Sequence, residues 1–149
     1  LPIYDIGKLI LFFEEPELSQ QVLLRAAETD GVTYHAEKDI IGFTHADVGA
    51  ALLKTWQLSD TLVDAISYHH EPLLARKHPL ETSIVHIANC VVNALEPGMD
   101  VDEHLLDDYP EFEPETLKIS GFKLKKLPQI MDKAWEQAAE VLDIICPKV

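Results

Sequence analysis

The sequence predicts an all-α domain, because its apolar residues recur with helical spacing over most of its 149 residues. Apolar residues make up 47% of the chain, which is enough to form one hydrophobic core in a domain of this length. No segment alternates polar and apolar residues convincingly, so we expect no β-sheet. The expected architecture is a compact bundle of several helices.

The charge and the cysteines exclude several classes of protein. The 26 acidic and 12 basic residues leave a formal net charge of −14, which disfavours binding to nucleic acid and to anionic membranes. Two cysteines without a C-x-x-C spacing support neither a disulfide scaffold nor a zinc ribbon. No apolar stretch approaches the roughly 18 to 20 residues of a membrane span, and the first residues lack the pattern of a secretory signal. We therefore expect a cytoplasmic chain that begins within a longer protein.

The first third of the chain predicts three helical segments. An apolar opening around Gly7 is followed by Pro16, which suits the first turn of a helix because its missing N–H is not needed there. The next apolar stripe ends before Gly31, a plausible residue after a helix C-terminus. A short helix over 35–41 is stopped by Gly42.

The middle of the chain has the clearest signals. Thr44 and Asp47 have the spacing of a capping box, with Asp in place of Glu, and begin a helix whose stripe runs to Trp56. Ser59 can cap the next helix, which we expect to continue until Pro72 excludes the α conformation from the residue before it. A third helix spans 84–95 and closes at Pro97 and Gly98.

The C-terminal third divides into two parts. Residues 99–115 are acidic and broken by two prolines, which is typical of a solvated connector with a short helix. Residues 124–145 form an amphipathic helix that we expect to pack on the same domain. The basic cluster before it, Lys123, Lys125 and Lys126, is interpreted as a solvated helix start, and Cys90 as a small buried hydrophobe.

Polar residues on the inward faces of these helices suggest a metal site. Asp5 precedes Gly7, His45 lies in the first turn of the Trp56 helix, and His69 and His70 close the next helix. Imidazoles and carboxylates that converge from several helices are how helical bundles build metal centres. Such a metal could activate water for phosphoester hydrolysis.

These residues resemble those of the HDOD domain, a degenerate relative of the HD and HD-GYP metal-dependent phosphohydrolases found in bacterial signalling proteins. The resemblance runs from Tyr4 to about Leu95, and it rests on D-I-G-K from Asp5, GFTHADVGAALLKTW over 42–56, AISYHHEP over 65–72 and IVHIAN over 84–89. It implies an HD-like bundle that is truncated at its N-terminus, with residues 1–98 as the C-terminal portion of the HDOD domain. Residues 99–149 are then the acidic connector and a C-terminal helix.

The sequence departs from the catalytic relatives at several positions. Tyr4 stands where their His-Asp dyad has His, Asn89 stands where they have Asp, and no Gly-Tyr-Pro follows His70. A neutral phenol and an amide oxygen are weaker metal ligands than an imidazole and a carboxylate. The resemblance therefore implies no catalytic residue and a vestigial ligand pocket made of Tyr4, Asp5, His45, His69, His70 and Asn89. If a metal is retained, its ligands are Asp5, His45, His69 and His70.

The expected function is a non-catalytic signal-transduction domain that acts through protein contacts or by binding a small ligand in the degenerate pocket. A residual HD-type metal-dependent phosphodiesterase is the alternative, and it would use the four metal ligands. We expect no cofactor, and a weakly bound divalent metal is the alternative that stays open. The expected partner is a signalling protein or an additional N-terminal domain that covers the apolar residues from Leu9 to Phe13, or a second copy of the chain.

Each site residue also has a purely structural interpretation. His45 could hydrogen-bond a backbone carbonyl, His69 and His70 could act as imidazolium ions at a helix C-terminus, and Asp5 could cap a turn. Trp56 is interpreted as a core residue, and Gly49 as a point where two helices approach closely. His78 is interpreted as a solvated loop residue, and His35, His86 and His104 are interpreted as structural or exposed.

Overall fold

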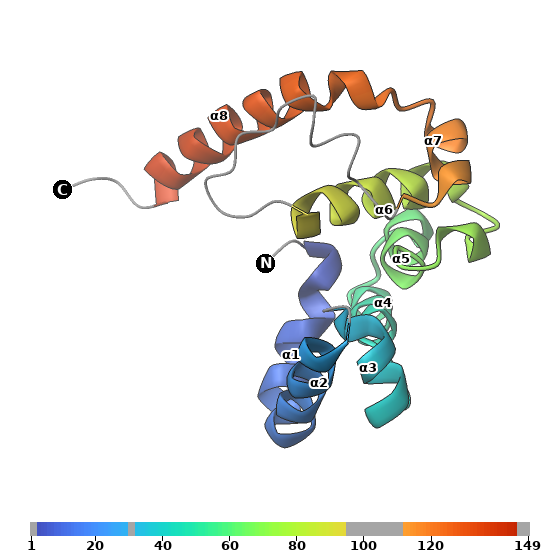
Figure 1. The fold of residues 1–149 in the computed structure, drawn as a ribbon, viewed down its shortest axis with the longest axis vertical. Coiled ribbons are helices and arrows are strands. Elements are labelled where there is room, and N and C mark those ends of the chain that lie inside the picture. Colours follow the sequence, from blue (N-terminus) through green and yellow to red (C-terminus); the bar gives the residue numbers. More distant parts are fainter. Residues whose placement is uncertain (1–2, 30–31, 95–111, 146–149) are drawn as a thin grey trace.

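The computed structural model describes residues 3–29, 32–94 and 112–145, which form helices with no strand among them (Figure 1). The α-helices are α1 (Ile6–Glu14), α2 (Pro16–Glu28), α3 (Thr33–Ile40), α4 (His45–Thr55), α5 (Asp60–Ser67), α6 (Pro79–Ala94), α7 (Pro114–Ser120) and α8 (Leu127–Ile145). The all-α prediction is confirmed. Within these ranges, no helix has both the length and the apolar composition needed to cross a membrane. His104 and most of the predicted acidic connector lie outside the described residues.

The helix starts follow the local signals in the sequence. Pro16 occupies the first turn of α2. Thr44 and Asp47 form a complete capping box, in which the Asp47 N–H donates to the Thr44 hydroxyl and the Thr44 N–H donates to Asp47 Oδ2. The Ser59 hydroxyl accepts a hydrogen bond from the Leu62 N–H at the start of α5. Each of these caps satisfies a backbone donor that a helix N-terminus leaves without a partner.

Helix α4 lies at the centre of the bundle, between α1 and α5, while α2 pairs with α3 and α6 joins α5 to α7 (Figure 1). The central core cluster consists of Tyr4, Ala50, Leu53, Val63 and Ile66. A second cluster joins α2 to α3, and a third joins α6 to the start of α8. The central cluster adjoins the segments that carry the predicted site residues, so the site lies against the best-packed part of the fold.

Glycine at position 7 allows α1 to approach α4 at backbone distance. A Cβ atom at Gly7 would lie 2.0 Å from the backbone oxygen of His45 and 2.8 Å from the backbone nitrogen of Gly49. At Gly49 the nearest atoms to an added Cβ are side-chain methyl groups of Ile66 and Ile6, at 3.1 and 3.4 Å. The interpretation of Gly49 as a close-approach position is confirmed, and Gly7 makes the tighter contact.

The interpretation of Trp56 as a core residue is wrong. Its side chain is 57% exposed, because α4 ends at Thr55 and Trp56 is the residue after the helix. The next residue, Gln57, has a φ of 57°, which turns the chain away from the helix axis. The buried face of α4 is made instead by His45, Ala46, Gly49, Ala50 and Leu53.

The C-terminal helix contacts the domain through its first turns. Leu127 is buried and the half-buried Met131 packs beside it, against Ile87 and Val91 of α6, while Ile130 is 44% exposed. Helix α8 then runs away from α1–α5 (Figure 1). Lys123, Lys125 and Lys126 are exposed ahead of it, as predicted, whereas Cys90 is only half-buried.

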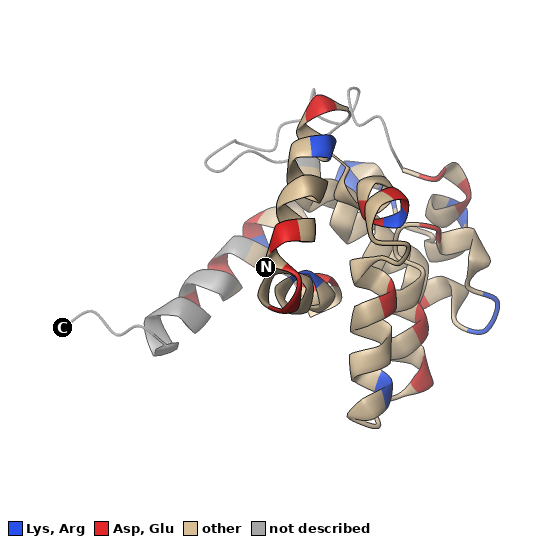
Figure 2. Ribbon diagram, turned by 90° about the horizontal axis from the view of Figure 1, so that it is seen from below, with Lys and Arg blue, Asp and Glu red and all other residues tan. Residues whose placement is uncertain are grey.

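Acidic residues are spread over many of the helices, with the fewer basic residues between them (Figure 2). Two of the acidic residues, Asp5 and Glu37, are buried. The negative charge of the described residues therefore belongs mostly to the surface, and the two buried carboxylates require a separate explanation.

We predict that Gly7→Ala destabilises the protein by about 3 kcal/mol or more, because the added methyl group meets backbone atoms that cannot rotate away. Gly49→Ala is the matched control. It should cost less than about 1 kcal/mol, because side-chain methyl groups can shift and alanine favours the helix. Urea denaturation of both variants gives the comparison, and equal stabilities would contradict the close backbone contact at Gly7.

Replacing Trp56 with alanine should lower the free energy of unfolding by less than about 1 kcal/mol, because its side chain is mostly in water. Leu53→Ala, in the same helix, should cost about 2 to 5 kcal/mol because Leu53 is buried in the central core. The two values are measured by urea denaturation. If Trp56→Ala lowered the free energy of unfolding as much as Leu53→Ala, Trp56 would belong to the core after all.

Candidate metal centre

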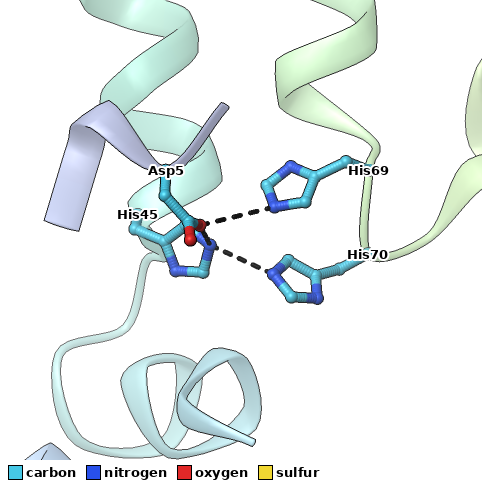
Figure 3. Close-up of side chains that lie close together, drawn as sticks. All are labelled: Asp5, His45, His69 and His70. Carbon is cyan, nitrogen blue, oxygen red and sulfur yellow. Dashed lines mark hydrogen bonds and ion pairs between the residues drawn. The ribbon is translucent and has the colours of Figure 1, made fainter. Parts of the chain in front are cut away.

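Four of the predicted site residues converge at one point inside the bundle (Figure 3). Asp5 ends a short 3₁₀ turn, Ile3–Asp5, and His45 is the first residue of α4. His69 and His70 follow α5, which ends at Ser67 rather than continuing to Pro72 as the sequence suggested. One donor atom from each of the four residues lies within 4.8 Å of the others. We call these four residues the cluster.

The cluster is enclosed by protein. His45 and His69 are fully buried, Asp5 is 5% exposed, and His70 is half-buried. The His45 Nε2 atom lies 3.1 Å from Asp5 Oδ1 and 3.0 Å from His70 Nε2, and the His69 Nε2 atom lies 3.8 Å from the same Asp5 oxygen. The atoms that face one another are thus three imidazole nitrogens and one carboxylate oxygen.

The protonation of His69 follows from its surroundings. Burial lowers the pKa of His69 to about 4, so the ring is neutral near pH 7. Its Nδ1 atom lies 2.7 Å from the backbone oxygen of Ile66, which can only accept, so Nδ1 carries the hydrogen. Nε2 is therefore a bare lone pair that points into the cluster. The interpretation of His69 as an imidazolium at a helix end is wrong, because the buried ring is uncharged.

His70 is also neutral and is held by an aromatic neighbour. Burial, together with the nearby His69 and His45, lowers the pKa of His70 to about 2, so the imidazolium interpretation is wrong for this residue as well. The Tyr34 ring stacks on the His70 ring with centroids 4.5 Å apart and an interplanar angle of 25°. The Tyr34 hydroxyl donates to the Glu71 carboxylate. The Tyr34 ring therefore covers one face of His70 and restricts its rotation.

His45 lies between two carboxylates, and no hydrogen bond joins its ring to a backbone carbonyl of the described residues. Its Nδ1 lies 2.6 Å from Glu37 Oε2, and its Nε2 faces Asp5. Burial would lower the pKa of His45, but the contacts with Asp5 and Glu37 outweigh burial and raise it. The structural interpretation of His45 was therefore right about its burial and wrong about its partner.

Asp5 likewise turns inward instead of capping a turn. It stands at the N-cap position of α1 without a side-chain capping hydrogen bond. Burial would raise the pKa of Asp5, but the contacts with His45 and Lys8 outweigh burial and lower it to about 2. Lys8 donates a hydrogen bond of 3.1 Å to Oδ2, which leaves Oδ1 to face the histidines. The Asp5 side chain is therefore a carboxylate in position to bind a cation.

Of the other two residues of the predicted pocket, Tyr4 adjoins the cluster. The Tyr4 ring centroid lies 5.3 Å from that of His69, and burial and the Asp5 charge raise the pKa of its hydroxyl to about 12, so the phenol is neutral. Asn89 is buried on α6, where its amide oxygen accepts a hydrogen bond from Asn93. Within the described residues, no hydrogen bond joins Asn89 to the cluster.

The cluster fits a divalent metal ion. Buried side-chain atoms without a hydrogen-bond partner among the described residues are Tyr4 Oη, Asp5 Oδ1 and His69 Nε2, and all three belong to the cluster or its immediate neighbour. Such orphaned buried atoms are rare in proteins and point to an ion or a water molecule. Three imidazoles and one carboxylate are a donor set suited to Zn²⁺, Mn²⁺ or Fe²⁺. The structure is thus compatible with a weakly bound divalent metal.

Sequence reasoning missed the residues that support the cluster: Lys8, Tyr34, Glu37 and His86. His86 Nε2 accepts from the Glu113 N–H, so its Nδ1 carries the hydrogen and donates to the backbone oxygen of His69 at 2.8 Å. A signal was present for Glu37, which lies three residues after Tyr34 and so shares its side of α3. His78, interpreted as a loop residue, is half-buried with its Nδ1 3.4 Å from the Thr61 hydroxyl.

A cleft of about 490 Å³ adjoins the cluster on the side of His70. Its walls come from the segment after His70, from α6 and from the start of α7, and they include Glu71, Leu74, His86, Phe112 and Glu113. No lysine or arginine of the described residues lines it. His70 is the member of the cluster that borders the cleft, so access from solvent is restricted to this residue.

The family comparison matches residues 3–72 to the HDOD domain. The match confirms the resemblance seen in the sequence for the segment that contains all four residues of the cluster, and it ends before Asn89. Searches of curated proteins and of solved structures found no match.

We predict that Tyr4→Phe stabilises the metal-free protein by about 1 kcal/mol, because it removes a buried hydroxyl that has no partner among the described residues. Tyr34→Phe is the contrasting variant. It removes a hydroxyl that is hydrogen-bonded to Glu71, so it should destabilise. Thermal and urea denaturation measure both changes, and a loss of stability in Tyr4→Phe would show that the hydroxyl has a partner.

Proposed function

Because residues 3–72 match the HDOD domain family, we propose that this protein is a regulatory domain that transmits signals through protein contacts and does not catalyse phosphoester hydrolysis. In this proposal the cluster binds a divalent metal as a structural ion. The cytoplasmic location expected from the sequence is part of the same proposal.

The enclosure of the cluster is the observation that carries this proposal. Catalytic metal sites keep a coordination position open to water and substrate, whereas structural sites are closed by protein ligands. Here three of the four donors are at most 5% exposed, and each comes from the protein. A phosphoester would have to displace His70 or the Tyr34 ring that covers it before it reached the other donors.

The chemistry of the surrounding residues supports the same conclusion. Tyr4 stands where the resemblance places the His of the catalytic dyad, and its neutral phenol has a pKa raised to about 12 by burial and by Asp5. Among the described residues, the lining of the cleft beside His70 includes the carboxylates Glu71 and Glu113 and no lysine or arginine. Carboxylates repel the negative charge of a phosphodiester, so the cleft is poorly suited to the substrates of phosphodiesterases.

Apolar side chains on the surface support a role in protein contacts. On α1, Leu9, Phe12 and Phe13 are 52%, 42% and 84% exposed, and on the adjacent α2, Leu23 and Leu24 are 47% and 61% exposed. Large exposed apolar patches on soluble proteins are typical of interaction surfaces. We infer that a signalling protein, a further domain of the same protein or a second copy of the chain covers this surface.

A residual metal-dependent phosphohydrolase is the second candidate, and the cleft at His70 is the observation in its favour. Asp5, His45, His69 and His70 would hold the metal, and Lewis acidity toward a phosphoryl oxygen is the chemistry that a bound divalent ion supplies. The cleft volume is within the usual range for small-ligand pockets. The two candidates differ in one measurable property, which is turnover.

We predict that the protein loaded with Mn²⁺, Zn²⁺ or Fe²⁺ shows no metal-dependent hydrolysis of bis-p-nitrophenyl phosphate or of cyclic dinucleotides, because substrate cannot reach the enclosed donors. The measurement is product release at high protein concentration. Metal-dependent turnover that disappears in both His69→Ala and His70→Ala would establish the hydrolase instead.

Addition of Zn²⁺ should raise the melting temperature of the wild-type protein, because an ion that binds only the folded state stabilises it. His69→Ala should abolish the increase. His35→Ala, which alters an exposed histidine outside the cluster, should retain it. Differential scanning calorimetry and elemental analysis measure stability and stoichiometry, and an equal response of both variants would place the metal elsewhere.

A further inference from the structure

We propose that Glu37 is a positioning residue for the metal centre, which holds the His45 ring with Nδ1 protonated and leaves Nε2 free to bind the ion. The inference rests on the proposed binding of a divalent metal by the cluster. It concerns a residue on α3 that is not itself a ligand in the cluster.

The contact between Glu37 and His45 is short, double and buried. The Glu37 Oε2 atom lies 2.6 Å from His45 Nδ1 and also accepts the backbone N–H of His45 at 2.7 Å. The side chains of Glu37 and His45 are 4% and 0% exposed. Two hydrogen bonds from one residue to one carboxylate oxygen fix both the backbone and the ring of His45.

This contact determines which nitrogen of His45 can bind a metal. The tautomer of a neutral histidine is set by the hydrogen bond that its other nitrogen makes. A carboxylate without a proton can only accept, so the nitrogen facing Glu37 carries the hydrogen. Nε2, which lies 3.1 Å from Asp5 Oδ1 and 3.0 Å from His70 Nε2, is then the ring nitrogen that can bind the ion. A carboxylate that orients a metal-binding histidine in this way also makes the imidazole a stronger base.

The buried charges also favour a divalent ion. Asp5 and Glu37 are the two buried carboxylates among the described residues, at 5% and 3% exposure. An isolated buried carboxylate is costly, and Lys8 makes an ion pair with Asp5 alone. With neutral histidines, Lys8 offsets the charge of Asp5, and the charge of Glu37 remains to favour a cation between the rings. Glu37 therefore contributes to the affinity through charge as well as through orientation.

Glu37 also has a structural role, because it accepts the first N–H of α4, and the experiment must separate the two roles. Glu37→Gln keeps the size of the side chain and an oxygen that can accept the backbone N–H, but it removes the charge. Asp39→Asn is the matched control, since it removes the same charge from an exposed position on the same helix. Loss of stability alone would not distinguish the roles, so affinity and tautomer are measured.

The affinity for Zn²⁺ is measured by competition with a chromophoric chelator. Glu37→Gln should bind Zn²⁺ about 10- to 100-fold more weakly than wild type, as is typical when the partner of a metal-bound histidine is altered. Asp39→Asn should remain within about twofold of wild type. Equal affinities of the two variants would overturn the inference.

The tautomer of His45 is read from long-range ¹H–¹⁵N correlations in metal-free, histidine-labelled wild-type protein, at a pH where the ring is neutral. The expected result is hydrogen on Nδ1, and hydrogen on Nε2 would overturn the inference whether or not the variant folds. Hydrogen on Nδ1 in a protein that binds no Zn²⁺ would contradict the proposed metal centre while supporting the orientation of His45 by Glu37. The two proposals can therefore fail separately.

Discussion

The approach of α1 to the first turn of α4 at Gly7 is the constraint on which the candidate centre depends. Position 7 admits no side chain, because the His45 backbone oxygen occupies the place of a Cβ. Asp5 lies two residues before this contact, and His45 is the residue contacted. The same backbone approach that closes the central core therefore brings the Asp5 carboxylate within 3.1 Å of the His45 ring. Wider spacing of α1 and α4 would leave room for larger side chains in the core, but it would separate Asp5 from His45.

Burial then determines the chemistry of the groups that this packing brings together. It keeps His69 and His70 neutral, and it leaves the lone pair of His69 opposite a carboxylate oxygen that also lacks a hydrogen-bond donor. Unsatisfied acceptors of this kind cost about 1 to 3 kcal/mol each unless a cation or water meets them. The net charge of −14 does not describe this interior, which holds two carboxylates near one lysine and three imidazoles.

The features predicted correctly from the sequence are those set by nearby residues. The caps at Thr44 and Ser59 and the helix start at Pro16 depend on backbone groups within three residues, so the local pattern suffices. The four residues of the cluster were identified through their order and spacing along the chain, which the resemblance to the HDOD domain supplied. Trp56 was misplaced because its exposure depends on where α4 ends. Glu37 was missed because its role exists only when α3 folds against the start of α4. Its spacing from Tyr34 indicates a shared side of α3, but it does not show that this side is buried.

The position of the ligands in the chain connects the centre to folding. Asp5, His45 and the His69–His70 pair come from three segments separated by 40 and 24 residues, so the unfolded chain cannot present them together. Binding energy at a site that exists only in the folded state is folding energy. Tyr34 and Glu37 extend this dependence to α3, whose Ala36 packs against Val22 and Ala26 of α2. A change in the packing of α2 on α3 would therefore alter the contacts that Glu37 makes with His45 and Tyr34 makes with His70. In the proposed regulatory role, binding of a metal at the cluster would be linked through these contacts to the state of a surface helix, and this link needs no turnover.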